Sequence, residues 1–338
     1  MTRAMNSQKW ALFLKINLGV FVLIVLQGCN SSQKQDREHL VFKYNEHSNI
    51  ATLDPAFARN PQTIWPSNQL FNGLVQLDDQ LNIQPDIAKS WRINDSTSTY
   101  TFTLRDDVYF HKNKVFKKDS TRSVVAQDFV YSFDRLLSPE LASPGSWVFN
   151  AVQRYHAAND STLVIQLNKP FPAFLGLLSM RYCSVVPKEA IAYYGNDFRS
   201  NPVGTGPFRF KFWEENVKLV LRKNPMYFEK DTQGNRLPYL EAVAITFLPD
   251  KQSEFLQFAQ GNIDFMTGLD NSYKDEIITT KGTLQPKYKD RVQLITTPYL
   301  NTEYLGFFMG SPTKEIASPL IRQAINYGFD RKKMVTYL

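Results

Sequence analysis

Residues 202–208 read Pro-Val-Gly-Thr-Gly-Pro-Phe. Two glycines separated by one residue can belong to a phosphate-binding loop, but the Gly-Lys-Ser/Thr sequence that completes such a loop does not follow them. Pro207 also lacks the backbone N–H group that would help to hold a phosphate. We therefore predict that residues 203–207 form a tight, hairpin-like turn, in which the glycines adopt backbone angles that other residues avoid.

The sequence on both sides of this turn carries strand-like and helix-like patterns. Apolar residues that alternate with polar ones, or run together between turn residues, predict strands, and they occur at 99–104, 162–167, 217–221 and 243–247. Apolar residues at helical spacing predict helices, and they occur at 126–137, 253–259 and 318–327. The chain is therefore predicted to belong to the mixed α/β class.

Charge and residue content argue against several classes of protein. The 338 residues carry a formal net charge of +7, and the chain without residues 1–28 has 36 basic and 32 acidic residues. This small excess is not clustered as it is in nucleic-acid-binding proteins, so we expect no nucleic-acid partner. The four histidines and two cysteines show no zinc-binding spacing, and no Gly-x-Ser-x-Gly motif occurs. We expect no enzymatic activity, no metal site and no cofactor.

The N-terminal sequence has the features of an export signal. Residues 1–15 are basic, residues 16–26 are largely apolar, and Leu26-Gln27-Gly28-Cys29 ends this region. The apolar run is shorter than the roughly 20 residues of a membrane-spanning helix, and the pattern is typical of a secretory signal peptide.

The Leu-x-Gly-Cys sequence resembles the lipobox of bacterial lipoproteins. This resemblance implies a signal peptide at 1–28, acylation of Cys29 and anchoring in the lipid bilayer. The polar residues that follow would make 29–38 a flexible tether. We expect a membrane-anchored lipoprotein on the periplasmic or cell-surface side. An ordinary signal peptide with a chance cysteine is the alternative.

Nine stretches of the chain resemble, in the same order, the motifs of family 5 of the extracellular solute-binding proteins, the oligopeptide- and dipeptide-binding group. Examples are Leu-Asp-Pro-Ala at 53–56 and Gln-Pro-Asp-Ile-Ala-Lys-Ser-Trp at 84–91. Each stretch is short, but together they extend over nearly the whole chain after the tether. They lie at 49–56, 65–75, 84–91, 100–105 with 110–111, 126–136, 202–208, 222–228, 261–265 and 321–327.

This resemblance implies a periplasmic-binding-protein-like clamshell of type II, in which crossing strands join two lobes. The first lobe would combine residues 39–75 with 197–270, and a small α/β subdomain at 76–196 would be inserted into it. The turn at 203–207 would return the chain from one subdomain to the next. Family members are longer than this chain, so residues 271–338 would form only the start of an incomplete, truncated second lobe.

The resemblance also implies capture of a ligand rather than catalysis. The protein would be the monomeric substrate-binding component of an ABC transporter, which binds short peptides, closes by a hinge motion and delivers them to the ABC permease subunits. In this family the loop after Leu-Asp-Pro-Ala lines the cleft, which points to Arg59, Asn60 and Pro61. The segment at 143–149 also reaches the ligand, and Trp147 is the candidate residue there.

Other functions stay open on the sequence alone. The same fold could bind nickel, haem, opines or oligosaccharides. The chain could also be a non-functional, truncated remnant, because second-lobe residues hold the peptide's amine in this family. A chain that ends at Leu338 is then expected neither to close on its ligand nor to bind it tightly, and to expose apolar surface. A hydrolase that uses the cleft has the least support, since no nucleophile–base motif is present.

Overall fold

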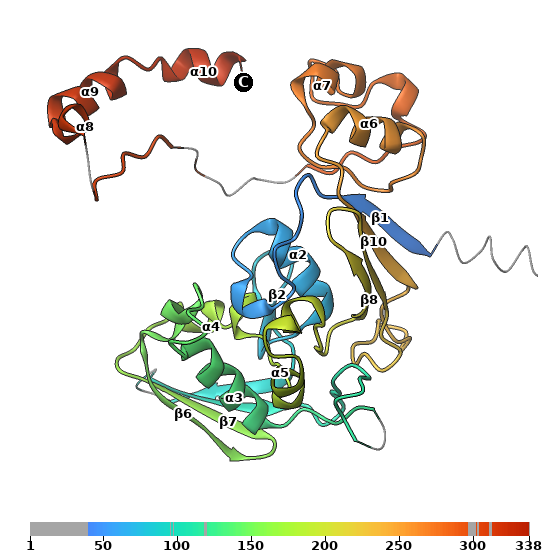
Figure 1. Cartoon of the computed structure of the whole chain (residues 1–338), viewed down its shortest axis with the longest axis vertical. Helices are drawn as coiled ribbons and strands as arrows, with labels where there is room; N and C mark the ends of the chain where they lie inside the picture. The colour runs from blue at the N-terminus through green and yellow to red at the C-terminus, as the bar shows by residue number, and fades with distance from the viewer. Residues whose placement is uncertain are drawn as a thin grey trace, which may run out of the picture. The chain divides into compact units, whose positions relative to one another are not determined.

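The computed structural model describes residues 40–94, 96, 98–117, 120–296, 302, 304–310 and 313–337 (Figure 1). The chain divides into two compact units, unit 1 over residues 1–270 and unit 2 over residues 271–338. The predicted signal peptide and tether, including Cys29, lie outside the described residues. Within the described ranges, no helix has both the length and the apolar character needed to cross a bilayer.

Strands from distant parts of unit 1 meet in one four-stranded sheet. β1 (Val41–Asn45) runs parallel to β10 (Ala242–Thr246), and β9 (Lys218–Lys223) and β8 (Phe208–Glu214) follow in antiparallel order. Alternate apolar side chains of these strands, such as Leu219 and Leu221, are buried, as a strand with one core-facing side requires. The strands predicted at 217–221 and 243–247 are confirmed, with ends that differ by one or two residues.

A second four-stranded sheet, with one helix packed on it, forms another part of unit 1. Its strands follow the order β4 (Ala88–Ile93), β5 (Thr99–Leu104), β7 (Thr162–Leu167) and β6 (Val152–Asn159), all antiparallel. The helix α3 (Ala126–Leu137) packs against β6 and β7, with Phe129 and Phe133 fully buried. The predicted strands at 99–104 and 162–167 and the predicted helix at 126–137 are confirmed at both ends.

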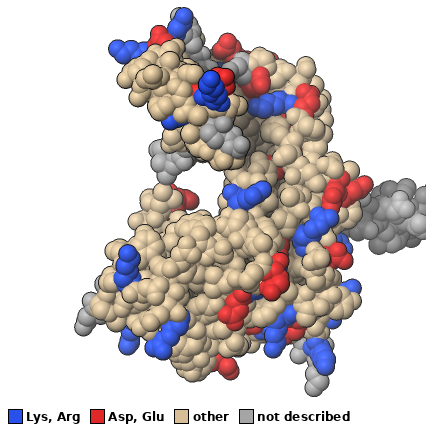
Figure 2. All heavy atoms as spheres, turned by 60° about the vertical axis from the view of Figure 1, so that its left-hand side comes forward, with Lys and Arg blue, Asp and Glu red and all other residues tan. Residues whose placement is uncertain are grey.

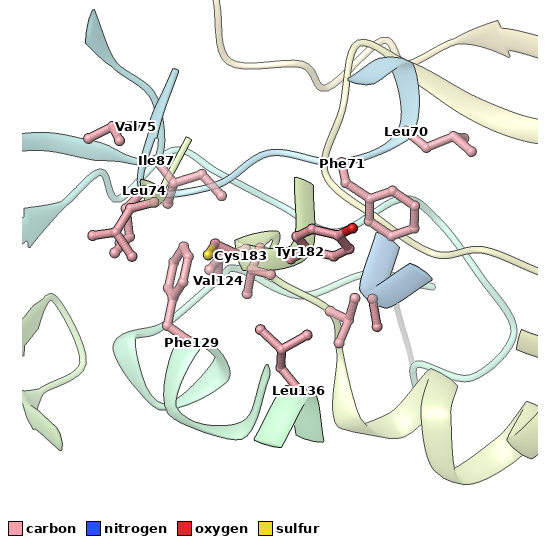
Figure 3. Close-up of a cluster of buried hydrophobic side chains, with 14 of the residues drawn as sticks. Leu70, Phe71, Leu74, Val75, Ile87, Val124, Phe129, Leu136, Tyr182 and Cys183 are labelled. Carbon is pink, nitrogen blue, oxygen red and sulfur yellow. The ribbon is translucent and has the colours of Figure 1, made fainter. Parts of the chain in front are cut away.

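Buried side chains from several elements meet in the core shown in Figure 3. Phe129 and Leu136 come from α3, Leu70 ends the helix α2 (Pro61–Leu70), and Leu74 and Ile87 flank the small β2–β3 ribbon. Because this cluster joins segments that are far apart in the sequence, unit 1 is held by one continuous core.

The remaining elements of unit 1 are short, apart from α6, which follows the last strand. They are η1 (Pro55–Phe57), β2 (Val75–Leu77), β3 (Ile83–Pro85), η2 (Ser146–Phe149), α4 (Phe174–Leu177), η3 (Arg181–Cys183), α5 (Lys188–Tyr194), η4 (Gly195–Ser200) and α6 (Lys251–Ala259), where η denotes a 3-10 helix. The helix predicted at 253–259 is confirmed by α6, which starts two residues earlier.

The described residues of unit 2 form short helices joined by loops, with one β-bridge between Ile278 and Leu284. Its helix α9 confirms the helix predicted at 318–327, and none of its side chains is buried, including the apolar Leu320, Ile325 and Tyr327. The helices of unit 2 are α7 (Asn271–Ile277), η5 (Pro286–Tyr288), α8 (Lys314–Ala317), α9 (Pro319–Tyr327) and α10 (Arg331–Tyr337).

The structure corrects the turn predicted at 203–207. These residues form no hairpin; they run along the C-terminal end of α2 before entering β8. The Gly206 N–H donates to the Leu70 carbonyl at 2.9 Å, and the Gly204 carbonyl accepts from the His111 N–H at 2.7 Å. Neither glycine has a positive φ. Glycine is needed because a Cβ at Gly204 would lie 2.0 Å from the Leu70 carbonyl oxygen.

Residues 204–206 cross closely over the C-terminal end of α2, and buried polar side chains form hydrogen bonds around this crossing. The Thr205 hydroxyl donates to the side-chain oxygen of Asn72 at 3.0 Å, and the Asn72 amide donates to Asp86 at 2.9 Å. His111 lies between the glycines, with its Nε2 3.0 Å from the Gly206 carbonyl and its Nδ1 accepting from the Gly204 N–H at 3.3 Å. Burial lowers the pKa of His111 to about 4, so the ring is neutral and can accept this hydrogen bond.

We expect Gly206→Ala to destabilise the protein by about 3 kcal/mol or more, because the new methyl group would meet backbone atoms that cannot move independently. A Cβ at Gly206 would lie 2.5 Å from the Gln69 carbonyl oxygen. Gly176→Ala is the matched control, since a Cβ there meets nothing within 4 Å. Urea unfolding monitored by circular dichroism measures both; equal stability of the two variants would contradict the steric account.

Candidate functional site

A pocket of about 600 Å³ lies on unit 1, where three segments come together. One segment is the loop at 51–60, the second is the stretch at 140–144 after α3, and the third is η4. Arg135 of α3 also lines it. This volume lies within the range of small-molecule sites in proteins. Because Arg59 and Asn60 of the predicted ligand loop line it, this pocket is the candidate ligand site.

Local capping interactions determine the path of the 51–60 loop. Asp54 accepts a hydrogen bond from the Ala56 N–H at 3.1 Å and thereby caps η1. Asn60 caps α2 in the same way, accepting from the Thr63 N–H at 3.1 Å, and Pro61 occupies the first helical position, where a missing N–H costs nothing. The residues between the two caps, including Arg59, are therefore held at the rim of the pocket.

An ion pair joins this loop to α3. Two guanidinium nitrogens of Arg135 lie 2.5 Å and 3.1 Å from the two carboxylate oxygens of Asp54. Both side chains are largely buried, with exposed fractions of 13% for Arg135 and 6% for Asp54. The guanidinium also lies 5.6 Å from the centre of the Phe198 ring in η4. Arg135 of α3 thus contacts both the 51–60 loop and η4.

Within the part of the chain that the structure describes, one pocket arginine forms no ion pair. Three arginines line the pocket, and Arg135 is paired with Asp54 while Arg199 is paired with Glu215 at 2.8 Å. The exposed Arg59 side chain makes no hydrogen bond or ion pair with any residue that the structure describes. A free guanidinium at the rim of a pocket is suited to bind a carboxylate or another planar anion.

The predicted site residues are distributed unevenly around this pocket. Arg59 and Asn60 line it, whereas Pro61 starts α2 and Trp147 lies in η2, 46% exposed and outside the lining. The segment at 143–149 still supports the site, because the Ser143 hydroxyl donates to the Ala56 carbonyl at 2.5 Å. Pro144, near the start of this segment, lines the pocket, and so do Glu140, Leu141 and Ala142 just before it.

Arg135 is the main contributor that sequence reasoning did not single out. It follows Asp128 and Ser132 along one face of α3, and both of these residues are buried. A charged residue that continues the buried face of a helix signals a partner inside the protein, since an unpaired buried charge is costly. The sequence therefore contained the signal for Arg135, although not for Asp54 as its partner.

A metal site requires several ligating side chains close together, and a nucleic-acid-binding surface requires clustered basic side chains. Among the described residues, no group of three or more His, Cys, Asp and Glu side chains lies where it could hold a metal ion. On the face drawn in Figure 2, Lys and Arg side chains are interspersed with Asp and Glu and form no continuous basic patch.

The model of the bacterial extracellular solute-binding proteins, family 5, matches residues 82–338. The chain belongs to this family. Glutathione-binding protein GsiB of Salmonella typhi is 24% identical over 288 residues, which are 85% of this chain and 52% of that protein. Heme-binding protein A of Haemophilus influenzae is 29% identical over 286 residues, which are 80% of this chain and 49% of that protein.

Solved structures place the fold among the periplasmic binding proteins. The ABC transporter-associated periplasmic binding protein DppA from Helicobacter pylori, in complex with the peptide STSA, matches with a TM-score of 0.63 and 27% identity. The match covers 70% of this chain and 48% of that one. The family 5 relatives are binding proteins of transporters rather than enzymes. The chain spans about half the length of the curated relatives it matches.

We expect Asp54→Asn to destabilise the protein by about 3 kcal/mol, because it leaves the Arg135 charge buried without a carboxylate. Asparagine retains an oxygen that can cap η1, so the variant isolates the loss of charge. Glu215→Gln is the control, since it removes a carboxylate from a half-exposed pair and is expected to cost less than about 1 kcal/mol. Thermal or urea unfolding compares them, and similar losses in both would contradict the importance of the buried pair.

Proposed function

We propose that this chain belongs to the substrate-binding component of an ABC importer and that its pocket contacts a short peptide. The observation that carries the proposal is the free Arg59 guanidinium at the rim of a 600 Å³ pocket on a family 5 chain. Support comes from the similarity to DppA, which was solved with a peptide.

The expected mechanism is capture without a chemical step. The rim loop is rigid because it is capped at both ends, so a ligand that binds there loses little energy to ordering the protein. Arg59 would pair with a ligand carboxylate, such as the C-terminus of a peptide. In this proposal residues 39–75 and 197–270 form the first lobe, residues 76–196 its inserted subdomain, and residues 271–338 contribute to the second lobe.

Haem is the second candidate ligand, because a relative at 29% identity is a heme-binding protein. The propionate carboxylates of haem would pair with the Arg59 guanidinium in the same way as a peptide carboxylate. Titration followed by visible absorbance separates the two candidates, since bound haem absorbs in the visible range and a peptide does not.

We expect the protein to bind short peptides with a free C-terminal carboxylate about tenfold more tightly than the same peptides with an amidated C-terminus. Arg59→Ala is expected to remove this difference, because it deletes the unpaired cation. Arg209→Ala is the control, since Arg209 is exposed on β8 and does not line the pocket. Calorimetric titration measures the affinities. Retention of the carboxylate preference by Arg59→Ala would contradict the assignment.

We also propose that Cys29 is acylated and anchors the protein to a membrane on the periplasmic side, where it would work with permease subunits. Cys29→Ser should abolish incorporation of an alkyne-labelled fatty acid, because the thiol that accepts the lipid is gone. Cys183→Ser is the matched control, as Cys183 is buried in the core. Equal labelling of Cys29→Ser and the wild type would contradict the anchor.

A further inference from the structure

A cluster of ionisable groups lies at the end of β1, away from the pocket. The chain leaves β1 at Asn45 and continues with Glu46 and His47, and Glu254 comes from the first half of α6. The two carboxylic side chains are almost completely buried, with exposed fractions of 6% for Glu46 and 3% for Glu254. Figure 1 shows α6 beyond the end of the β1–β10 pair.

The two carboxyl groups differ in their hydrogen-bond partners. One Glu254 oxygen lies 3.0 Å from the His47 Nε2, and the other accepts from the Asn45 amide at 3.3 Å. By contrast, the Glu46 Oε1 atom is buried and has no hydrogen-bond partner among the described residues, and the same holds for the His47 Nδ1 atom. A buried charged carboxylate without a partner is costly, whereas a neutral carboxylic acid is much less so.

The groups around Glu46 reinforce this preference for the neutral form. The charge of Glu254 acts on it from α6, and its own charge acts on Tyr44 of β1. The basic groups His47 and Lys251 act on Glu254. Asp250, which caps α6, adds a further acidic group, exposed and bonded to the Ser253 N–H. Burial and the Glu254 charge raise the pKa of Glu46 from 4.5 to about 7.

We propose that Glu46, His47 and Glu254 form a proton-binding latch that fastens α6 to the end of β1, and that loss of the proton from Glu46 loosens α6. Loss of this proton would weaken the contacts between β1 and the loop before α6. In this loop the Leu248 N–H donates to the Asn45 side chain at 2.7 Å. α6 is the last helix of unit 1.

The direction of the pH effect follows from the position of the proton. Because the folded state holds the Glu46 proton more tightly than the unfolded chain, this group stabilises the fold fully below pH 4.5. The stabilisation is lost as the pH rises toward about 7. A difference between pKa values of 4.5 and about 7 sets an upper limit of roughly 300-fold on the change in the unfolding equilibrium constant.

The test compares the 338-residue wild type with Glu46→Gln, which keeps the shape of the neutral acid and cannot lose a proton. Between about pH 5 and about pH 8, we expect the unfolding equilibrium constant of the wild type to rise at least about tenfold relative to Glu46→Gln. Glu214→Gln is the control, an exposed glutamate at the end of β8, and it should follow the wild type. Hydrogen exchange should localise the difference to peptides of β1 and α6.

Parallel pH profiles of the wild type and Glu46→Gln would overturn the latch. If Glu46→Gln does not fold, Glu254→Gln serves instead, because removal of its charge should shrink the pH dependence; an unchanged dependence would overturn the proposal. Infrared spectroscopy gives a second readout. Burial also raises the pKa of Asp86 to about 7, so the band must be assigned by comparison with Glu46→Gln. A carboxylic-acid C=O band near pH 6 that weakens at about pH 8 in the wild type and is missing from Glu46→Gln supports the latch, and identical bands in the two proteins overturn it.

Discussion

The close crossing of residues 204–206 over the end of α2 is the constraint on which unit 1 depends. At this point two backbone segments touch without any side chain between them, since a Cβ at either glycine would overlap the α2 backbone. Buried polar side chains, including His111, Thr205 and Asn72, form hydrogen bonds at the crossing. It places β8, and with it the sheet that contains β1, beside the helix whose other end forms the pocket rim.

This arrangement determines the geometry of the pocket. α2 is anchored at its C-terminal end by the crossing and at its N-terminal end by the Asn60 cap, so the 51–60 loop has little freedom. The Asp54–Arg135 pair then ties this loop to α3. Among the described residues, two of the three pocket arginines form ion pairs with carboxylates, and the third, Arg59, forms none.

Much of the local structure could be predicted from the sequence, because it depends on patterns within a few residues. The helix at 126–137 and the strands at 99–104 and 162–167 have strong apolar periodicity and were located at both ends. The role of the Gly204 and Gly206 pair was misread, since their need for glycine comes from α2, over 130 residues earlier in the chain. Arg135 was missed for the same reason: its partner is 81 residues away. Arg59 and Asn60 came from family resemblance, and their role as ligand contacts stays a prediction.

The central claim is that unit 1 binds its ligand in the pocket between the 51–60 loop, α3 and η4. Photo-crosslinking tests this claim directly. Short peptides that carry a benzophenone side chain would be irradiated with the protein, and the labelled residues identified by mass spectrometry. Because crosslinking captures weak complexes, it does not require tight binding. The account predicts that labels concentrate at residues 51–60, 140–144 and 195–199 and that unmodified peptide competes for them. Labels that lie elsewhere, or that competition does not reduce, would contradict it.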